Sequence, residues 1–111
     1  MSRLIIIFTL VLFSSVVNAS TSIAVTGTIQ AMRTQTTHHE TLASHGEVII
    51  QLSAPLQDGC NWLSVEKDNT SAISFLLSAK AQNQIITAWY YSDKKSKAWG
   101  SACQLINIEL K

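Results

Sequence analysis

The chain has 111 residues, of which 14% are charged, and its formal net charge is +1 at pH 7. This length suits one domain, and the charge is too small for nucleic-acid binding, which needs clustered Lys and Arg. The sequence also lacks the nucleophile-elbow, HExxH and phosphate-loop patterns. We therefore expect neither a nucleic-acid partner nor an enzyme, and we assign no catalytic residue.

Residues 1–19 have the order of a secretory signal peptide. Arg3 supplies a positive charge, Leu4–Val17 is almost entirely apolar, and Val17-Asn18-Ala19 ends in small residues that suit signal peptidase. A membrane anchor is the alternative, but the apolar run is shorter than the roughly 20 residues of a spanning helix. We predict an exported protein, periplasmic or secreted, with no stable membrane anchor and with residues 20–111 as its single domain.

The first half of this domain is predicted to contain three strands. Residues 23–32 alternate between apolar and polar types, which is the period of a strand, and Gly27 suggests a bulge or a sharp bend within it. Residues 33–46 are a polar loop, and residues 47–53 form the second strand. The third strand covers residues 60–66, and its periodicity allows two inward sets. These sets are Leu63 with Val65, or Cys60 with Trp62.

The second half begins with a predicted helix over residues 72–82. Three candidate N-caps precede it at positions 68–70, and Asn83 tolerates the left-handed conformation that ends helices. A fourth strand follows at residues 84–91 with apolar residues on both faces, then a charged loop at 92–97, and a last strand at 103–110. The order β-β-β-α-β-β predicts a mainly β protein with one helix.

Cys60 and Cys103 are the only cysteines in the chain. An even number of cysteines in an exported protein usually means disulfides, whereas two cysteines without a nearby Cys or His partner are too few to hold zinc. We therefore predict a disulfide between them, which would also help a domain of this size to stay folded.

Several local features match a known group of exported proteins. They are the signal peptide, Cys-Asn-Trp entering a strand, an Ala-rich helix, a Trp-Tyr-Tyr strand and the closing Ala-Cys-Gln-Leu-Ile-Asn-Ile-Glu-Leu. Together with the element order they resemble the OB-fold, a five-stranded, partly open Greek-key barrel. Within that fold the chain is similar to small periplasmic proteins and to the B subunits of bacterial AB5 toxins, especially the subtilase cytotoxin B-like type.

This resemblance implies three further features. The third and fifth strands would be parallel neighbours, which would bring Cys60 and Cys103 to the same end of the barrel. The loops at residues 33–46 and 92–101 would flank the ligand face. A toxin-like B subunit would in addition assemble into a ring of identical copies.

The first of these loops contains three histidines, which are good ligands for transition metals. His38, His39 and His45 could act with Glu40, but a solvated loop that happens to contain histidines is the alternative. Tight metal sites need ligands on rigid elements, so we assign no metal and no cofactor. We retain His38 and His39 as candidate ligand-binding residues.

The aromatic residues are expected to divide between core and surface. We expect Trp62 and Trp89 to fill the core and Tyr90 and Tyr91 to cover its rim, since aromatic residues supply much of the buried area in small domains. Trp99 stands beside Gly100 and a charged loop, so it is a better candidate for ligand contact.

The loop at residues 92–97 carries a short basic tip. Lys94, Lys95 and Lys97 lie there, and they form either a solvated tip or an anion-binding surface. We take Lys95 as the candidate ligand residue of this tip, alongside His38, His39 and Trp99.

Two functions are consistent with these features. The first is a small exported binding module that recognises a glycan, a small molecule or a partner protein, either alone or as a homo-oligomer of the toxin B-subunit type. The second is a monomeric periplasmic structural or interaction protein with no small-molecule ligand.

Overall fold

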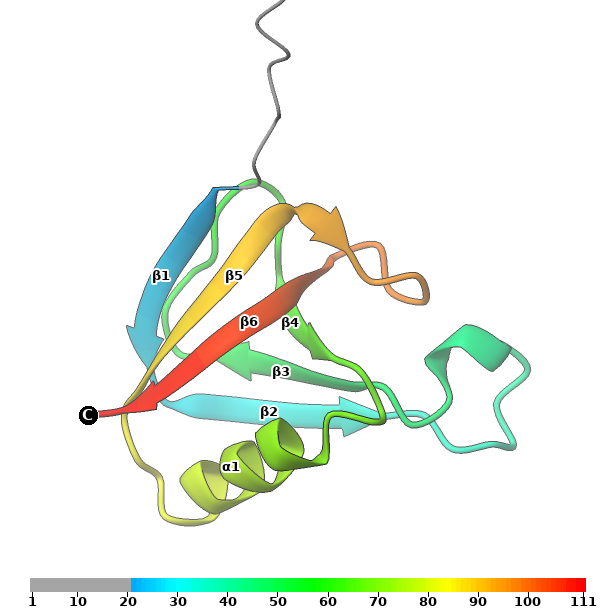
Figure 1. Ribbon diagram of the computed structural model, residues 1–111, viewed down its shortest axis with the longest axis horizontal. Helices are drawn as coiled ribbons and strands as arrows, with labels where there is room; N and C mark the ends of the chain where they lie inside the picture. Colours follow the sequence, from blue (N-terminus) through cyan, green and yellow to red (C-terminus); the bar gives the residue numbers. More distant parts are fainter. Residues whose placement is uncertain (1–20) are drawn as a thin grey trace, which may run out of the picture.

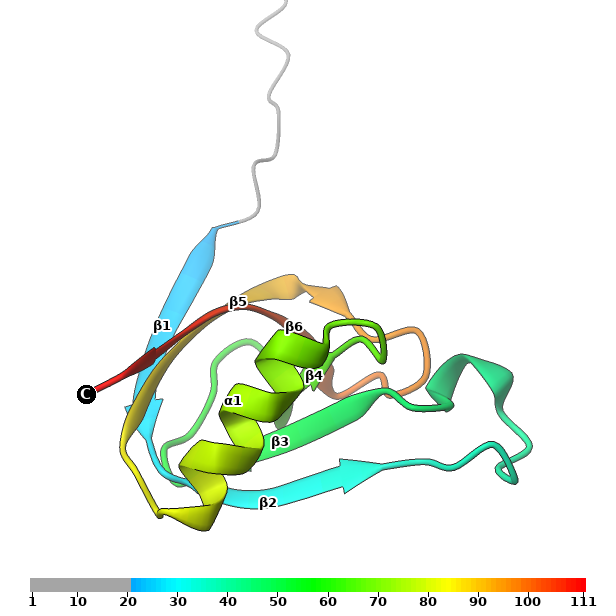
Figure 2. The ribbon, with the colours of Figure 1, turned by 60° about the horizontal axis from the view of Figure 1, so that its bottom comes forward.

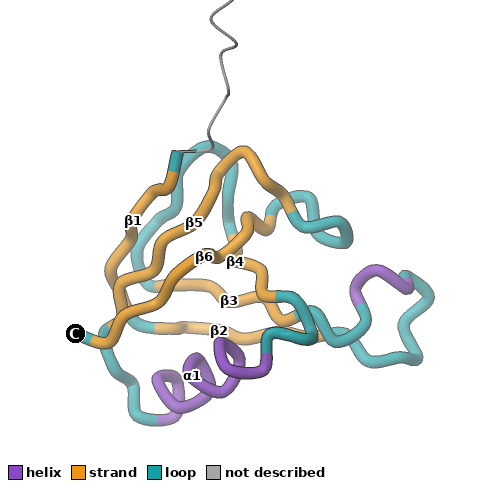
Figure 3. The backbone as a smooth tube through the Cα atoms, viewed as in Figure 1, coloured by secondary structure: helices purple, strands orange, loops and turns teal. Residues whose placement is uncertain are grey.

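The structure is a computed structural model that describes residues 21–111, so the predicted signal peptide lies outside the described residues. It is mainly β with one α-helix, as predicted (Figure 1, Figure 3). The elements in chain order are β1 (Ser22–Gly27), β2 (Ile29–Thr34), the 3-10 turn η1 (Leu42–Ser44), β3 (Val48–Leu52), β4 (Trp62–Val65), α1 (Thr70–Ala81), β5 (Ile86–Lys95) and β6 (Ala102–Leu110).

The strands form one sheet in the order β1-β5-β6-β4-β3-β2. All neighbouring pairs are antiparallel except β4 and β6, which run parallel through Trp62–Ser64 and Ala102–Gln104. β4 and β6 correspond to the third and fifth predicted strands, so these two strands are the parallel neighbours that the resemblance implies. Figure 2 shows the curved sheet with α1 lying beside β2 and β3.

The first predicted strand, residues 23–32, is in fact two strands. β1 pairs only with β5 and β2 only with β3, with Thr28 between them. Gly27 allows the close approach of chain that the bend requires, because a Cβ on it would lie 2.6 Å from Ser53 Oγ. The sheet therefore has six strands with β1 and β2 at its edges and no ladder joining them, and a closed five-stranded barrel is not confirmed.

The helix begins and ends at residues that the sequence singles out. Asn69 is the N-cap, and its Oδ1 accepts a hydrogen bond from the N–H of Ala72 at 3.4 Å. Asn83 follows the helix with φ +50°, the left-handed conformation expected at a helix end. Leu76 and Ala79 are buried, and the helix covers β2.

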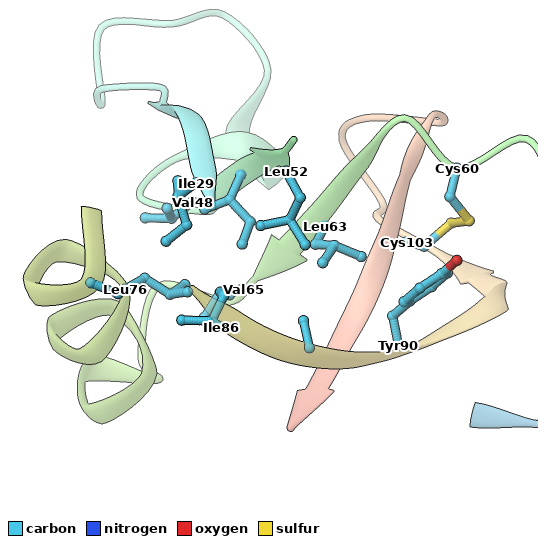
Figure 4. Close-up of a cluster of buried hydrophobic side chains, with 13 residues drawn as sticks. Ile29, Val48, Leu52, Cys60, Leu63, Val65, Leu76, Ile86, Tyr90 and Cys103 are labelled. Atoms are coloured by element: carbon cyan, nitrogen blue, oxygen red, sulfur yellow. A yellow bond between two sulfur atoms is a disulfide. The ribbon is translucent and has the colours of Figure 1, made fainter. Parts of the chain in front are cut away.

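The buried side chains of the sheet and helix form one cluster (Figure 4). Leu63 and Val65 are buried in it, which decides the phase of the third predicted strand, while Trp62 is only half-buried. Cys60 is buried as well, although it lies before β4 begins.

The expected division of the aromatic residues is wrong for β5. Tyr90 has no exposed surface and is the largest fully buried side chain, whereas Trp89 is half-exposed. The reason is the phase of the strand, because Ile86, Ala88 and Tyr90 point inward and Trp89 lies between two of them. The hydroxyl of Tyr90 accepts a hydrogen bond from the N–H of Gln57 at 2.9 Å, so the polar end of this buried ring has a partner.

The charged loop predicted at residues 92–97 is also partly wrong. β5 continues through Ser92 to Lys95, and Lys95 pairs with Cys103 after an irregularity in the ladder. The ammonium group of Lys94 lies 5.1 Å from the centre of the Tyr91 ring, a cation–π contact within this irregular end of the strand.

The predicted disulfide between Cys60 and Cys103 is present, with its two Cα atoms 5.7 Å apart. Both cysteines are buried at the same end of the core cluster as Tyr90 (Figure 4). Within residues 21–111, no helix combines the length and the apolar character that crossing a bilayer would require.

Candidate binding cleft

A cavity of about 800 Å³ lies where β4 and β6 diverge. The ladder between these strands ends at Ser64 and Gln104, and β6 continues beside β5 alone. The residues from Ser64 to Asn69 line the cavity together with Gln104 and Leu105. The cavity therefore opens because the pairing of β4 with β6 ends at this point of the sheet.

The two loops that were expected to flank a ligand face both contribute to this cavity. Leu42, Ala43, His45 and Glu47 line it from one side, and Ser96 and Lys97 line it from the other. Figure 1 shows both loops on the same side of the sheet.

The longer loop, residues 35–47, is held in place by its own hydrogen bonds. The N–H of Gly46 donates to the carbonyl of Gln35 at 2.9 Å, and Ser44 Oγ donates to the carbonyl of Thr41 at 2.8 Å. The ring of His45 donates from Nε2 to the carbonyl of His39. These hydrogen bonds fix the shape of the loop, which has no hydrophobic core of its own.

The shorter loop, between β5 and β6, is organised by Ser96. Its Oγ accepts hydrogen bonds from the N–H groups of Ala98 and Trp99, at 3.1 and 3.2 Å. Its own N–H donates to the carbonyl of Ala102 at 2.7 Å. Ser96 therefore fixes the turn that presents Lys97 to the cavity.

The floor of the cavity is polar. Ser64 is buried, and its Oγ donates to the carbonyl of Cys103 at 3.3 Å, which leaves that oxygen able to accept another hydrogen bond. Glu47 is only 8% exposed, and its carbonyl accepts a hydrogen bond from Thr34 Oγ1 at 2.9 Å. Gln104 is half-buried beside them.

Charges of both signs surround this floor. Glu47, Glu66 and Asp68 are acidic, and Lys67 and Lys97 are basic. No ion pair joins these five side chains within the described part of the chain. No described Phe, Tyr or Trp lines the cavity. The surface can therefore offer charged groups, hydrogen bonds and the imidazole ring of His45, but none of the large aromatic faces on which sugars usually stack.

A smaller apolar groove of about 330 Å³ adjoins the cavity. It lies between α1 and β6, shares Val65, Asn69 and Leu105 with the cavity, and is lined further along by Phe75 and Ile106. The two together form a cleft with a polar, charged end and an apolar end, which we call the β4–β6 cleft.

The predicted ligand residues His38 and His39 lie in the longer loop but do not line the cleft. His38 is exposed, and the Nδ1 atom of His39 accepts a hydrogen bond from the N–H of Thr41 at 3.0 Å. His45, named only as a possible metal ligand, is the histidine that the structure places in the cleft. Among the described residues, no group of three His, Cys, Asp or Glu side chains could hold a metal ion.

Trp99 and Lys95 also lie outside the cleft lining. Trp99 is half-buried in the turn that Ser96 organises. Lys95 Nζ donates to the carbonyl of Asp58 at 3.2 Å and lies 3.2 Å from Cys103 Sγ and 3.5 Å from Cys60 Sγ. The ligand-binding role proposed for these residues stays a prediction.

The residues that line the cleft were mostly not singled out in the sequence. Ser64 and Gln104 occupy outward positions of their strands, where alternation alone cannot distinguish a cleft floor from an ordinary solvent face. Glu47 stands at the start of a predicted strand, and nothing in its neighbours marks it as buried. Of the lining residues, the sequence singles out only Lys97 and His45 as possible ligand or metal groups, and Asp68 and Asn69 as candidate helix N-caps.

Comparison of the chain with protein-family models, with curated proteins and with solved structures gives no match.

Proposed function

We propose that this chain is a small exported, non-catalytic binding module whose ligand is a segment of a partner protein, bound in the β4–β6 cleft. The observation that carries the proposal is the cavity of about 800 Å³ walled by two separate loops at the end of the β4–β6 ladder. Clefts formed where two strands diverge and flanked by loops are common positions for ligands.

The lining favours a protein segment over a glycan. Sugar-binding surfaces usually present large aromatic faces, and no described Phe, Tyr or Trp lines the larger cavity. A peptide has both charged and apolar side chains, and the cleft offers a charged end next to an apolar groove lined by Phe75 and Ile106.

We propose further that the fold is of the OB type. Three observations support this. β1 and β2 follow each other directly in the chain and occupy the two edges of one curved sheet, β4 and β6 are parallel, and a helix connects β4 to β5. In an OB-fold a single bent first strand pairs with both ends of the sheet, and the ligand face lies between the two loops that here wall the cavity.

Export and ring assembly belong to the same proposal. The disulfide is of the kind that persists in oxidising compartments, which suits a periplasmic or secreted protein. A toxin B-like subunit would form a ring of identical copies, whereas the alternative periplasmic interaction protein would be a monomer. Light scattering on the exported protein distinguishes them, because a monomeric mass overturns the toxin-like part while leaving the cleft proposal intact.

The binding proposal is tested with two libraries and a matched pair of variants. The exported protein is screened against a peptide display library and against a glycan array. Gln104→Ala removes a side chain from the cleft, and Gln30→Ala removes the same side chain from an exposed position outside it. We expect peptides that bind the wild type and Gln30→Ala but not Gln104→Ala. Glycan binding that is lost in Trp99→Ala, with no peptide binding that depends on Gln104, would overturn the proposal.

A further inference from the structure

Two acidic residues of the cleft, Glu47 and Glu66, lie just beyond the paired ends of β3 and β4. In the ladder between β3 and β4, Val48 lies opposite Val65, so the next outward positions place Glu47 opposite Glu66. The two segments stay close one residue further along, at Gly46 and Lys67, because a Cβ added to Gly46 would lie 2.9 Å from the Cβ of Lys67. Both Glu47 and Glu66 line the cavity.

Such an arrangement is unfavourable when the cleft is empty. Side chains directly opposite on antiparallel strands have Cβ atoms about 4.5–5.5 Å apart, and like charges at that distance repel. A structural pair of this kind would be expected to hold a Lys or Arg between its members, but neither carboxylate forms an ion pair in residues 21–111.

Glu47 is the more informative of the two. It is 8% exposed, and no hydrogen bond or ion pair to its carboxylate is found in the described structure. Among the described residues, every buried side-chain oxygen or nitrogen that is sealed from solvent has a hydrogen-bond partner. Because the carboxylate of Glu47 has no such partner, it must be in contact with solvent, and the cavity that Glu47 lines supplies this contact. A nearly buried charge with no protein partner is costly unless something else neutralises it.

A cationic group bound in the cleft would neutralise this carboxylate, and the surrounding residues limit the kind of cation that fits. A metal ion would need more ligands than converge here, since no described group of three His, Cys, Asp or Glu side chains could hold one. The stem of Lys67 lies against Gly46, and Lys97 is exposed at the rim, so neither occupies the space between the carboxylates.

We propose that the cleft binds its partner through a Lys or Arg side chain, whose ammonium or guanidinium group lies between Glu47 and Glu66. This inference rests on the proposed function, because it specifies the side chain that the bound segment must carry. Ser64 Oγ and the side-chain amide oxygen of Gln104 lie on the same floor and can accept the remaining N–H groups. The apolar stem of the bound residue fits beside Val65 and Leu105, as long basic side chains do on apolar surfaces.

If Glu47 and Glu66 serve binding, neutralising them should have opposite effects on binding and on stability. Because the two carboxylates repel each other in the free protein, Glu47→Gln and Glu66→Gln should raise the urea midpoint of unfolding while weakening the binding of a cation. Carboxylates that serve the fold would lower the midpoint when neutralised. Glu66 is exposed, so its variant folds even if the change at the buried Glu47 does not.

The experiment is a titration of the ¹⁵N-labelled exported protein with N-acetyl-arginine amide and N-acetyl-lysine amide, followed by backbone chemical shifts. The corresponding citrulline and norleucine amides are the neutral controls. We expect shifts at cleft residues such as Gln104 and Lys67 with the cationic amides, and binding weaker by at least about tenfold with the neutral ones. Glu47→Gln and Glu66→Gln should weaken cation binding to a similar extent, whereas Glu109→Gln, an exposed change outside the cleft, should not.

Three results would overturn the inference. The first is equal binding of the charged and neutral amides. The second is cation binding that both glutamine variants retain. The third is loss of binding in Lys97→Gln, which would indicate an anionic ligand. None of these results would overturn the proposed function, which is tested separately by the peptide binding of the Gln104→Ala variant.

Discussion

The disulfide offers the sharpest test of how this small domain stays folded. Replacing both cysteines with alanine removes the crosslink and avoids leaving two buried thiols. The bond joins residues separated by 43 positions, and the chain-entropy model assigns a closed loop of this length about 4 kcal/mol at 25 °C. Since domains are stable by only about 5–15 kcal/mol, the variant should lose between about a quarter and about four fifths of the original stability.

The measurement is urea unfolding of the protein, followed by tryptophan fluorescence, for the wild type and for the Cys60→Ala, Cys103→Ala double variant. We expect a loss of about 2–5 kcal/mol in the free energy of unfolding. A reductant should destabilise the wild type and leave the double variant unchanged, which serves as the control. A loss below about 1 kcal/mol, with the disulfide verified by mass in the wild type, would contradict the argument from loop closure.

Three further predictions concern single residues and use the same unfolding assay. Tyr90→Phe removes the acceptor of the Gln57 N–H and should cost about 1 kcal/mol, because the ring still fills its buried site. Gly27→Ala places a Cβ 2.6 Å from Ser53 Oγ, which already accepts a hydrogen bond from the chain at 3.0 Å, and should cost about 1–3 kcal/mol. Asn69→Ala removes the N-cap of α1 and should cost about 1 kcal/mol.

Each of these changes has an outcome that would count against its stated cause. Gly100→Ala is the control for the bend, since no atom lies within 4 Å of the added Cβ, and equal losses at the two glycines would remove the steric explanation. An unchanged Tyr90→Phe protein would mean that water replaces the phenol as partner of the Gln57 N–H. For Asn69→Ala, unaltered helix content and stability would rule out a role in capping.

The fold could be anticipated where local chemistry and tertiary structure favour the same outcome. Asn69 caps the start of α1 and Asn83 adopts the left-handed conformation after its end. Both preferences are local, so they do not depend on what the helix packs against. The pairing of Cys60 with Cys103 agrees with the expectation from their number and from the predicted export. The bend near Gly27 was also indicated, although nothing local says that the two halves of the strand pair with different partners.

The phase of β5 could not be anticipated, because both of its faces are apolar. Only packing against the rest of the sheet decides that Tyr90 points inward and Trp89 outward. The end of β5 was missed for a similar reason. Lys95 belongs to the strand because Cys103 lies beside it, and that neighbour comes from a distant part of the sequence.

The cleft was anticipated only as a place. Its two flanking loops are those that the OB-fold resemblance implies, but the side chains between them depend on where the β4–β6 ladder stops. Glu47 and Glu66 are far apart in the sequence, and each is an ordinary acidic residue at a strand end. Their juxtaposition arises only from the register of β3 against β4.

The pairing of β1 with β5 has a consequence for the order in which the domain can assemble. Thr26 and Thr87, whose side-chain oxygens lie 2.9 Å apart, are separated by 61 positions. β1 is therefore synthesised long before its only partner strand exists, and Cys103 follows later still. Contacts of such long range form slowly, and an unpaired strand edge invites mispairing with other chains. If the chain is exported N-terminus first, as proposed, β1 must stay separated from other chains until β5 has also crossed the membrane.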